Sequence, residues 1–115
     1  MDQTFEITEN EAGGLPVVSV AGEIDVATAP QLRDRLQAQV AAGNATIGVD
    51  LLDVTFLDST ALGVLVGALK RCREAGGDLR LVMAEPRILK VFEITGLTGV
   101  FSIYATVDEA REGGR

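Results

Sequence analysis

Short apolar runs typical of β-strands alternate with helix-like stretches along most of this 115-residue chain. The helix-like stretches carry apolar residues every three or four positions, as in Leu32, Leu36 and Val40. The predicted order is two strands, then a helix followed by a strand three times, then a final helix. This alternation is typical of a mostly parallel sheet with right-handed crossovers. The sequence therefore predicts an α/β fold with a five-stranded sheet and about four helices.

Turn and capping residues mark the boundaries of these elements. A turn over Glu9–Gly14 joins the first two apolar runs, which predicts an N-terminal β-hairpin, and its antiparallel strand makes the sheet mixed. The predicted strands are Phe5–Ile7, Leu15–Val20, Thr46–Leu52, Leu79–Met83 and Val100–Tyr104. The predicted helices begin at residues suited to helix N-termini, namely Thr28, the segment Asp58–Thr60, Pro86 and Thr106.

Length and apolar content fit one domain. A chain of 115 residues that is 47% hydrophobic is long enough to bury one core. We therefore expect a single domain over residues 1–115, with a core of about 4–110 and a frayed tail of 111–115. Cys72 lies on the apolar stripe of the second predicted helix, so we expect it to pack in the core rather than to act as a redox sensor.

The formal net charge of −7 disfavours nucleic acid and anionic membranes as direct partners, because both attract basic surfaces. No apolar run reaches the roughly 18 residues of a membrane-spanning helix. The N-terminus lacks the pattern of a signal peptide. A single Cys excludes an internal disulfide, which suits a cytoplasmic protein.

The chain contains no His, which restricts its chemistry. A Ser–His–Asp triad and imidazole metal ligation are excluded within it, and one Cys cannot build a thiolate site. Lys70 lies about three helical turns beyond Ser59, too far to activate that hydroxyl. We expect no catalytic residues, no metal and no cofactor.

Carboxylates around the third predicted strand raise one alternative, a Mg²⁺-dependent phospho-acceptor aspartate as in a response-regulator receiver. The aspartates are Asp50, Asp53 and Asp58. Such a site also needs an acidic pair after the first strand, which Glu23 and Asp25 resemble, and a lysine after a later strand. The segment Met83–Pro86 contains no lysine, so this alternative is disfavoured.

The polar segment Asp58–Thr60 lies between a predicted buried strand and an amphipathic helix. Two roles are open to Ser59 there. It can cap the helix through its side-chain oxygen, which is the commoner role of such a residue. Its hydroxyl can instead accept a phosphate, since a helix N-terminus stabilises an anion by roughly 0.3–1 kcal/mol. The loop Gly22–Asp25 gains functional meaning only if it lies beside Ser59 in space.

Four segments in order, Gly22–Asp25, Asp50–Leu51, Phe56–Gly63 and Ile94–Leu97, extend over almost the whole chain. Together they resemble the STAS domain, and more narrowly the bacterial anti-sigma factor antagonists of the SpoIIAA and RsbV type. The run Gly22–Pro30 and the segment Ile88–Leu97 especially resemble the actinobacterial BldG-type members. Ala61 departs from the pattern, because many relatives have Gly there.

The resemblance implies partner switching. The unphosphorylated antagonist binds an anti-sigma factor that is also a serine kinase, and this frees the sigma factor. The kinase then uses ATP to phosphorylate the antagonist and ends the interaction, and a serine phosphatase restores it. The resemblance implies Ser59 as phosphorylation site and Thr60 as secondary acceptor. It implies partner contacts by Gly22, Glu23, Asp25, Asp58, Thr60 and Leu62.

Two functions remain open. The first is a phosphorylation-switched anti-sigma factor antagonist, a bacterial signalling protein that regulates transcription without catalytic activity of its own. The second keeps the STAS fold without the switch, as a scaffold of a stress-signalling assembly or an accessory module of a membrane transporter. The intact Asp58–Ser59 pair favours the first.

Overall fold

The computed structural model describes residues 5–113, which form a five-stranded sheet in the order β1-β2-β3-β4-β5 and four helices. The elements are β1 (Glu6–Ala12), β2 (Leu15–Ile24), α1 (Ala29–Ala41), β3 (Ile47–Leu57), α2 (Ser59–Glu74), β4 (Leu79–Val82), α3 (Pro86–Ile94), β5 (Ser102–Tyr104) and α4 (Val107–Glu112). β1 pairs antiparallel with β2, and the remaining neighbours pair in parallel. The predicted mixed α/β fold with an N-terminal hairpin is confirmed.

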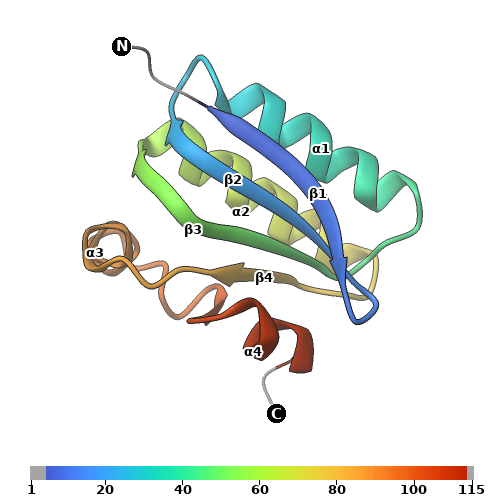
Figure 1. The fold of residues 1–115 in the computed structure, drawn as a ribbon. Coiled ribbons are helices and arrows are strands. Elements are labelled where there is room, and N and C mark those ends of the chain that lie inside the picture. The colour runs from blue at the N-terminus through green and yellow to red at the C-terminus, as the bar shows by residue number, and fades with distance from the viewer. Residues whose placement is uncertain (1–4, 114–115) are drawn as a thin grey trace.

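The main core lies between the sheet and the helices α1 and α2, which pack together behind the sheet in Figure 1. α2 contributes most to this core among the helices, since its buried side chains recur at helical spacing. They are Ala61, Leu62, Leu65, Ala68, Leu69 and Cys72. Full burial of a Leu side chain contributes about 1.5–3 kcal/mol. The buried position of Cys72 confirms its predicted packing role.

A smaller core lies beneath α4, which is drawn below β4 in the view of Figure 1 and contacts β3, β4 and β5. Its buried residues are Leu15, Val17, Val82 and Ala110. The Thr106 hydroxyl caps α4 by accepting a hydrogen bond from the Glu109 amide at 3.1 Å, as the spacing predicted. α4 includes residues 111 and 112, which the sequence analysis assigned to the tail, whereas residues 4, 114 and 115 lie outside the described residues.

β3 is longer than the predicted strand Thr46–Leu52, and that boundary was wrong. The parallel pairing of β2 with β3 continues to Ile24 and Leu57, with register shifts between Ser19 and Ala21 and between Gly22 and Glu23. These irregularities leave residues 52 and 53 both exposed, which breaks the alternation by which a strand is identified in a sequence. The polar segment at Asp58 therefore follows the strand directly.

Other boundaries also differ from prediction. β2 continues through Gly22 to Ile24 because it pairs with β3 there, so the predicted loop Gly22–Asp25 is mostly strand. The predicted turn Glu9–Gly14 shortens to Gly13 and Gly14, because positive φ angles of 56° and 92° allow a two-residue hairpin turn there. β5 begins at Ser102 rather than at Val100, which lies in a turn.

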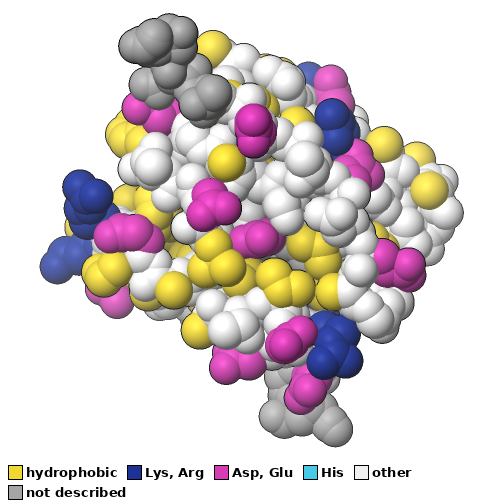
Figure 2. Space-filling view, in the orientation of Figure 1, with side chains coloured by type: hydrophobic (Ala, Val, Ile, Leu, Met, Phe, Trp, Pro, Cys, Tyr) yellow, Lys and Arg dark blue, Asp and Glu magenta, His cyan; other side chains and the backbone are white. Residues whose placement is uncertain are grey.

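Acidic side chains are spread over the face shown in Figure 2, and most basic side chains lie toward its margins. This pattern agrees with the net charge of −7. Within residues 5–113, none of the helices has the length and apolar character needed to cross a membrane.

We expect Gly77→Ala to destabilise the protein by about 1–3 kcal/mol, because a Cβ there would overlap the carbonyl group of Ala45. Urea denaturation monitored by circular dichroism measures this change. Gly99→Ala is the matched control: no atom lies within 4 Å of its added Cβ, and its expected effect is within about 0.5 kcal/mol. Equal stabilities of the two variants would contradict the close approach of these segments.

We expect the Cys72 thiol to resist thiol reagents in the folded protein. Burial raises the pKa of this thiol, and the Asp78 carboxylate raises it further, against a smaller opposite effect of Arg71. Both burial and a raised pKa lower the amount of reactive thiolate. Ellman's reagent should therefore react slowly in buffer at pH 8 and rapidly in urea. Similar rates in the two solvents would contradict the buried position.

Candidate functional site

Asp58 forms the junction between β3 and α2. Its backbone is extended, with φ −112° and ψ −172°, and its side chain accepts a hydrogen bond from the Ala61 amide at 3.0 Å. The Asp58 carbonyl accepts the first helical hydrogen bond, from the Leu62 amide at 3.1 Å. Asp58 is therefore the N-cap of α2, and its carboxylate also complements the positive end of the helix.

Ser59 is the first residue of α2, and both Ser59 and Thr60 are exposed. The capping role that the sequence left open for Ser59 is wrong, because Asp58 fills it. Within residues 5–113 the Ser59 hydroxyl has no hydrogen-bond partner. The helix thus leaves this hydroxyl available to solvent, beside amide groups that favour an anion.

The segment Gly22–Asp25 lies directly beside the start of α2. Glu23 pairs with Phe56 and Ile24 pairs with Leu57 in the parallel ladder. The Asp58 amide donates a hydrogen bond to the Ile24 carbonyl at 3.2 Å, just beyond the last pair. The segment Gly22–Asp25 therefore lies close to Ser59, as a joint functional role of the two segments requires.

Gly22 adopts a φ of +99° at the register shift between β2 and β3. Side chains other than Gly are strained in this region, so the bend requires glycine. Gly22 thus contributes to the site through its backbone conformation. The bend at Gly22 places Glu23 and the following loop beside the end of β3.

Asp25 organises the loop between β2 and α1. Its Oδ1 accepts hydrogen bonds from the amides of Ala27 and Thr28, at 2.9 and 3.1 Å. Thr28 occupies the N-cap position of α1 but makes no side-chain capping bond, which corrects the predicted role. Its hydroxyl instead accepts from the Asp25 amide at 2.9 Å and donates to the Glu23 carbonyl at 2.9 Å. These bonds fix the loop next to Ser59.

Leu62 and Ala61 lie beneath the site rather than on its surface. Leu62 is 8% exposed and belongs to the main core, so it supports α2 from below. Ala61 is fully buried, and its methyl group fills space between α2 and the sheet. The departure from Gly at Ala61 therefore alters an inward-facing position and leaves the exposed face at Ser59 unchanged.

Two exposed apolar side chains, Val26 and Phe56, were not among the site residues expected from the sequence. Val26 is 72% exposed in the loop after Asp25, and Phe56 is 48% exposed near the end of β3. Phe56 could have been found if β3 had been extended through its β-branched and aromatic residues.

The aspartates of the receiver alternative do not gather at the end of a strand. Asp50 lies within β3, where its carboxylate accepts from the Ser19 hydroxyl at 3.2 Å and from the Leu52 amide at 3.0 Å. The strand continues from there to Leu57. Among the described residues, His, Cys, Asp and Glu side chains form no group of three that could hold a metal.

The segment Ile94–Leu97 forms the end of α3 and the turn after it. The Thr95 hydroxyl donates to the Val91 carbonyl at 2.8 Å, and the Leu97 amide donates to the Phe92 carbonyl at 2.8 Å. Gly96 has a φ of +76° in this turn. Ile94 is 75% exposed, whereas Leu97 packs against the main core, so this segment ends α3 and anchors the turn that follows.

Comparison with known proteins agrees with this geometry. Residues 6–110 match the STAS domain. The anti-sigma-B factor antagonist of Bacillus subtilis (strain 168) is 43% identical over 88 residues, which cover 76% of this chain and 80% of the relative. The crystal structure of an anti-sigma factor antagonist from Mycobacterium paratuberculosis aligns with a TM-score of 0.86 and 32% identity, covering 95% of this chain and 92% of that one.

A further structure is that of the Bacillus cell fate determinant SpoIIAA in its phosphorylated form. It aligns with a TM-score of 0.72 and 26% identity, covering 97% of this chain and 100% of SpoIIAA. The resemblance seen in the sequence is therefore confirmed over nearly all of the described residues. The chain belongs to the STAS domain family.

Proposed function

We propose that this chain is an anti-sigma factor antagonist and that Ser59 is its regulatory phosphorylation site. The unphosphorylated form binds an anti-sigma factor through the start of α2 and the segment Gly22–Asp25. This releases a sigma factor and so controls transcription. The names of the relatives, anti-sigma-B factor antagonist and anti-sigma factor antagonist, support the first part of this proposal.

Phosphoryl transfer ends the interaction in this proposal. The anti-sigma factor acts as a serine kinase: the Ser59 oxygen attacks the terminal phosphorus of ATP, ADP leaves, and the hydroxyl proton passes to a base of the kinase. A serine phosphatase later hydrolyses the phosphate ester and regenerates the hydroxyl. The antagonist itself supplies the acceptor and the docking surface.

One observation carries the choice of Ser59. Its hydroxyl is exposed and has no hydrogen-bond partner within residues 5–113, because Asp58 provides the helix cap. Transfer of a phosphate to Ser59 therefore breaks no bond that holds α2 in place. Thr60 is also exposed and is the secondary acceptor.

A phosphate at this position changes the surface locally. It adds about −1.5 to −2 charges at neutral pH. The nearby carboxylates of Asp58, Glu23 and Asp25 make the surface more acidic still. A partner that docks there loses close contacts and meets repulsion, while α2 keeps its cap. The likeness to SpoIIAA in its phosphorylated form supports such a switch within the same fold.

We expect Ser59→Ala to bind the anti-sigma factor in the presence and absence of ATP, because it lacks the acceptor. We expect Ser59→Asp to bind at least about tenfold more weakly than the wild type, because a buried like charge at an interface costs more than 1.4 kcal/mol. Isothermal titration calorimetry with candidate anti-sigma factors measures both affinities, and mass spectrometry after incubation with ATP maps the phosphate.

Thr60→Ala is the matched control and should remain a substrate at Ser59. Wild-type affinity of Ser59→Asp, together with no phosphate at Ser59 or Thr60, would refute the switch. That result would favour a phosphorylation-independent STAS scaffold or transporter-accessory module.

Gly63 gives a second test, since it lies one helical turn beyond Ser59 on the same face of α2. It is exposed, and no atom lies within 4 Å of a Cβ added there. We expect Gly63→Ala to stabilise the fold by about 0.5–1 kcal/mol, because glycine is unfavourable within a helix. We also expect it to weaken partner binding, because the new methyl group lies in the docking surface.

Gly67→Ala adds the same methyl group one turn further along α2, with only the Arg71 side chain within 4 Å. It should leave partner affinity unchanged. Urea denaturation and calorimetry separate stability from binding. Unaltered affinity of the Gly63 variant would exclude this part of α2 from the docking surface.

A further inference from the structure

A polar pocket of about 280 Å³ lies at the opposite end of the sheet from Ser59. We call it the arginine pocket; its lining residues are Gly13, Gly14, Leu15, Thr46, Arg80 and Arg111. Thr46 directly precedes β3, and Asp58 directly follows it. At about 3.3 Å per strand residue, the pocket and Ser59 are separated by roughly 30 Å.

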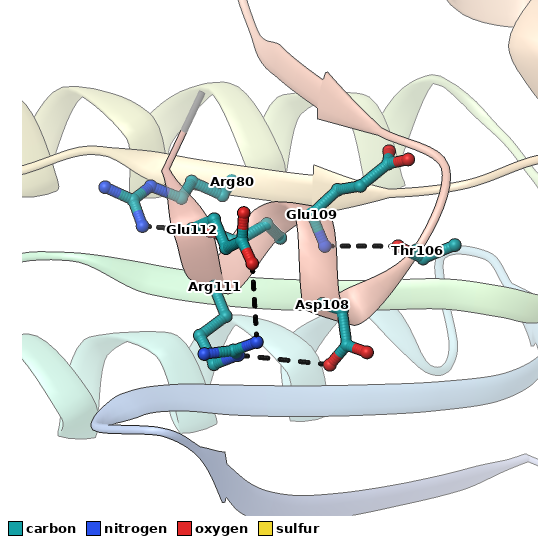
Figure 3. A network of polar contacts seen from close by, with 7 residues as sticks. Arg80, Thr106, Asp108, Glu109, Arg111 and Glu112 are labelled. Carbon is teal, nitrogen blue, oxygen red and sulfur yellow. Dashed lines mark hydrogen bonds and ion pairs between the residues drawn. The ribbon is translucent and has the colours of Figure 1, made fainter. Parts of the chain in front are cut away.

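Arg80 extends from β4 to the C-terminal end of α4, where its Nη1 donates to the Ala110 carbonyl at 2.9 Å (Figure 3). Gly113 ends α4 with a φ of +79°, and a Cβ there would lie 3.0 Å from Nη2 of Arg80. The guanidinium group is thus confined by the backbone around it. Within residues 5–113, no carboxylate lies within ion-pair distance of Arg80.

Arg111 enters the pocket from α4. Its closest carboxylates are those of Glu112 at 3.6 Å and Asp108 at 3.9 Å, both exposed (Figure 3). Exposed pairs at such distances contribute about 0–1 kcal/mol, so they hold Arg111 weakly. Its aliphatic stem packs so closely on Gly13 that an added Cβ would overlap its Cδ. The glycine turn of the hairpin therefore makes room for this arginine.

The side chains of three lining residues can donate hydrogen bonds. Each guanidinium carries five N–H groups, and Thr46 adds a hydroxyl. Within residues 5–113, the two guanidinium groups together make one hydrogen bond, that of Arg80 to the Ala110 carbonyl. Two cationic guanidinium groups that line one pocket are suited to a doubly charged oxyanion. A carboxylate, with one charge and two oxygens, matches them less well.

We propose that the arginine pocket binds a phosphate group, either as inorganic phosphate or as part of a small phosphomonoester. The two guanidinium groups contact the phosphate oxygens, and Thr46 and the glycine turn complete the site. The pocket lies roughly 30 Å from Ser59, so phosphate binding here is tested separately from phosphorylation at Ser59.

Titration with inorganic phosphate, glycerol phosphate and acetate at constant ionic strength tests this proposal. Two-dimensional ¹H–¹⁵N NMR follows the amides of Gly13 and Gly14 and the Nε–H groups of the arginines. We expect saturable shifts with phosphate or glycerol phosphate and weaker ones with acetate. Tighter binding of one of the first two identifies the source of the phosphate group.

Arg80→Gln and Arg111→Gln should each weaken binding about tenfold or more, because each removes charged hydrogen bonds. Arg87→Gln removes the same charge from a side chain that is 89% exposed outside the pocket, and should bind as the wild type does. If Arg80→Gln fails to fold, Arg111→Gln decides, since the Arg111 side chain makes only two weak ion pairs within residues 5–113. Shifts that do not saturate, or that persist equally in Arg111→Gln, overturn the proposal.

Discussion

The parallel pairing of β2 with β3 is the constraint on which the site depends. It ends in the hydrogen bond from the Asp58 amide to the Ile24 carbonyl, at 3.2 Å. This bond joins two polar segments that lie more than thirty positions apart in the sequence. The same pairing directs Val54 and Leu57 into the core, so a slip in register would expose apolar side chains. The pairing of β2 with β3 therefore fixes both the packing of the core and the position of the site residues.

The site separates the residues that hold the backbone from the residue left free. Asp58 caps α2, while Asp25 and Thr28 hold the neighbouring loop through hydrogen bonds. Ser59 takes no part in these bonds within residues 5–113. In the switch that we propose, the Ser59 hydroxyl is phosphorylated and restored without melting the helix that presents it. The cap provided by Asp58 is the physical reason for proposing the neighbouring serine as the acceptor.

The fold class is predictable from the sequence because most helices and strands show the spacing of apolar residues that is typical of their type. The four-residue spacing of Leu32 and Leu36 and the stripe on α2 both correspond to buried faces. Prediction from the sequence failed at the end of β3, where register shifts place residues 52 and 53 on exposed positions and disrupt alternation. It also failed to distinguish Asp58 from Ser59 as the cap, since both side chains suit that role. Phe56 lies in the part of β3 after Leu52, which the same disruption of alternation concealed.

The sequence by itself determined the order of strands and helices, the apolar faces of the first two helices and the absence of imidazole chemistry. These follow from local periodicity and composition, which need no knowledge of distant contacts. Only the tertiary structure decided that Gly22–Asp25 lies beside Ser59, that Asp58 takes the cap, and that Arg80 and Arg111 share a pocket. Each of these features depends on contacts between particular atoms. Local periodicity and composition do not specify which atoms come within hydrogen-bonding or packing distance, so these contacts are known only from the folded structure.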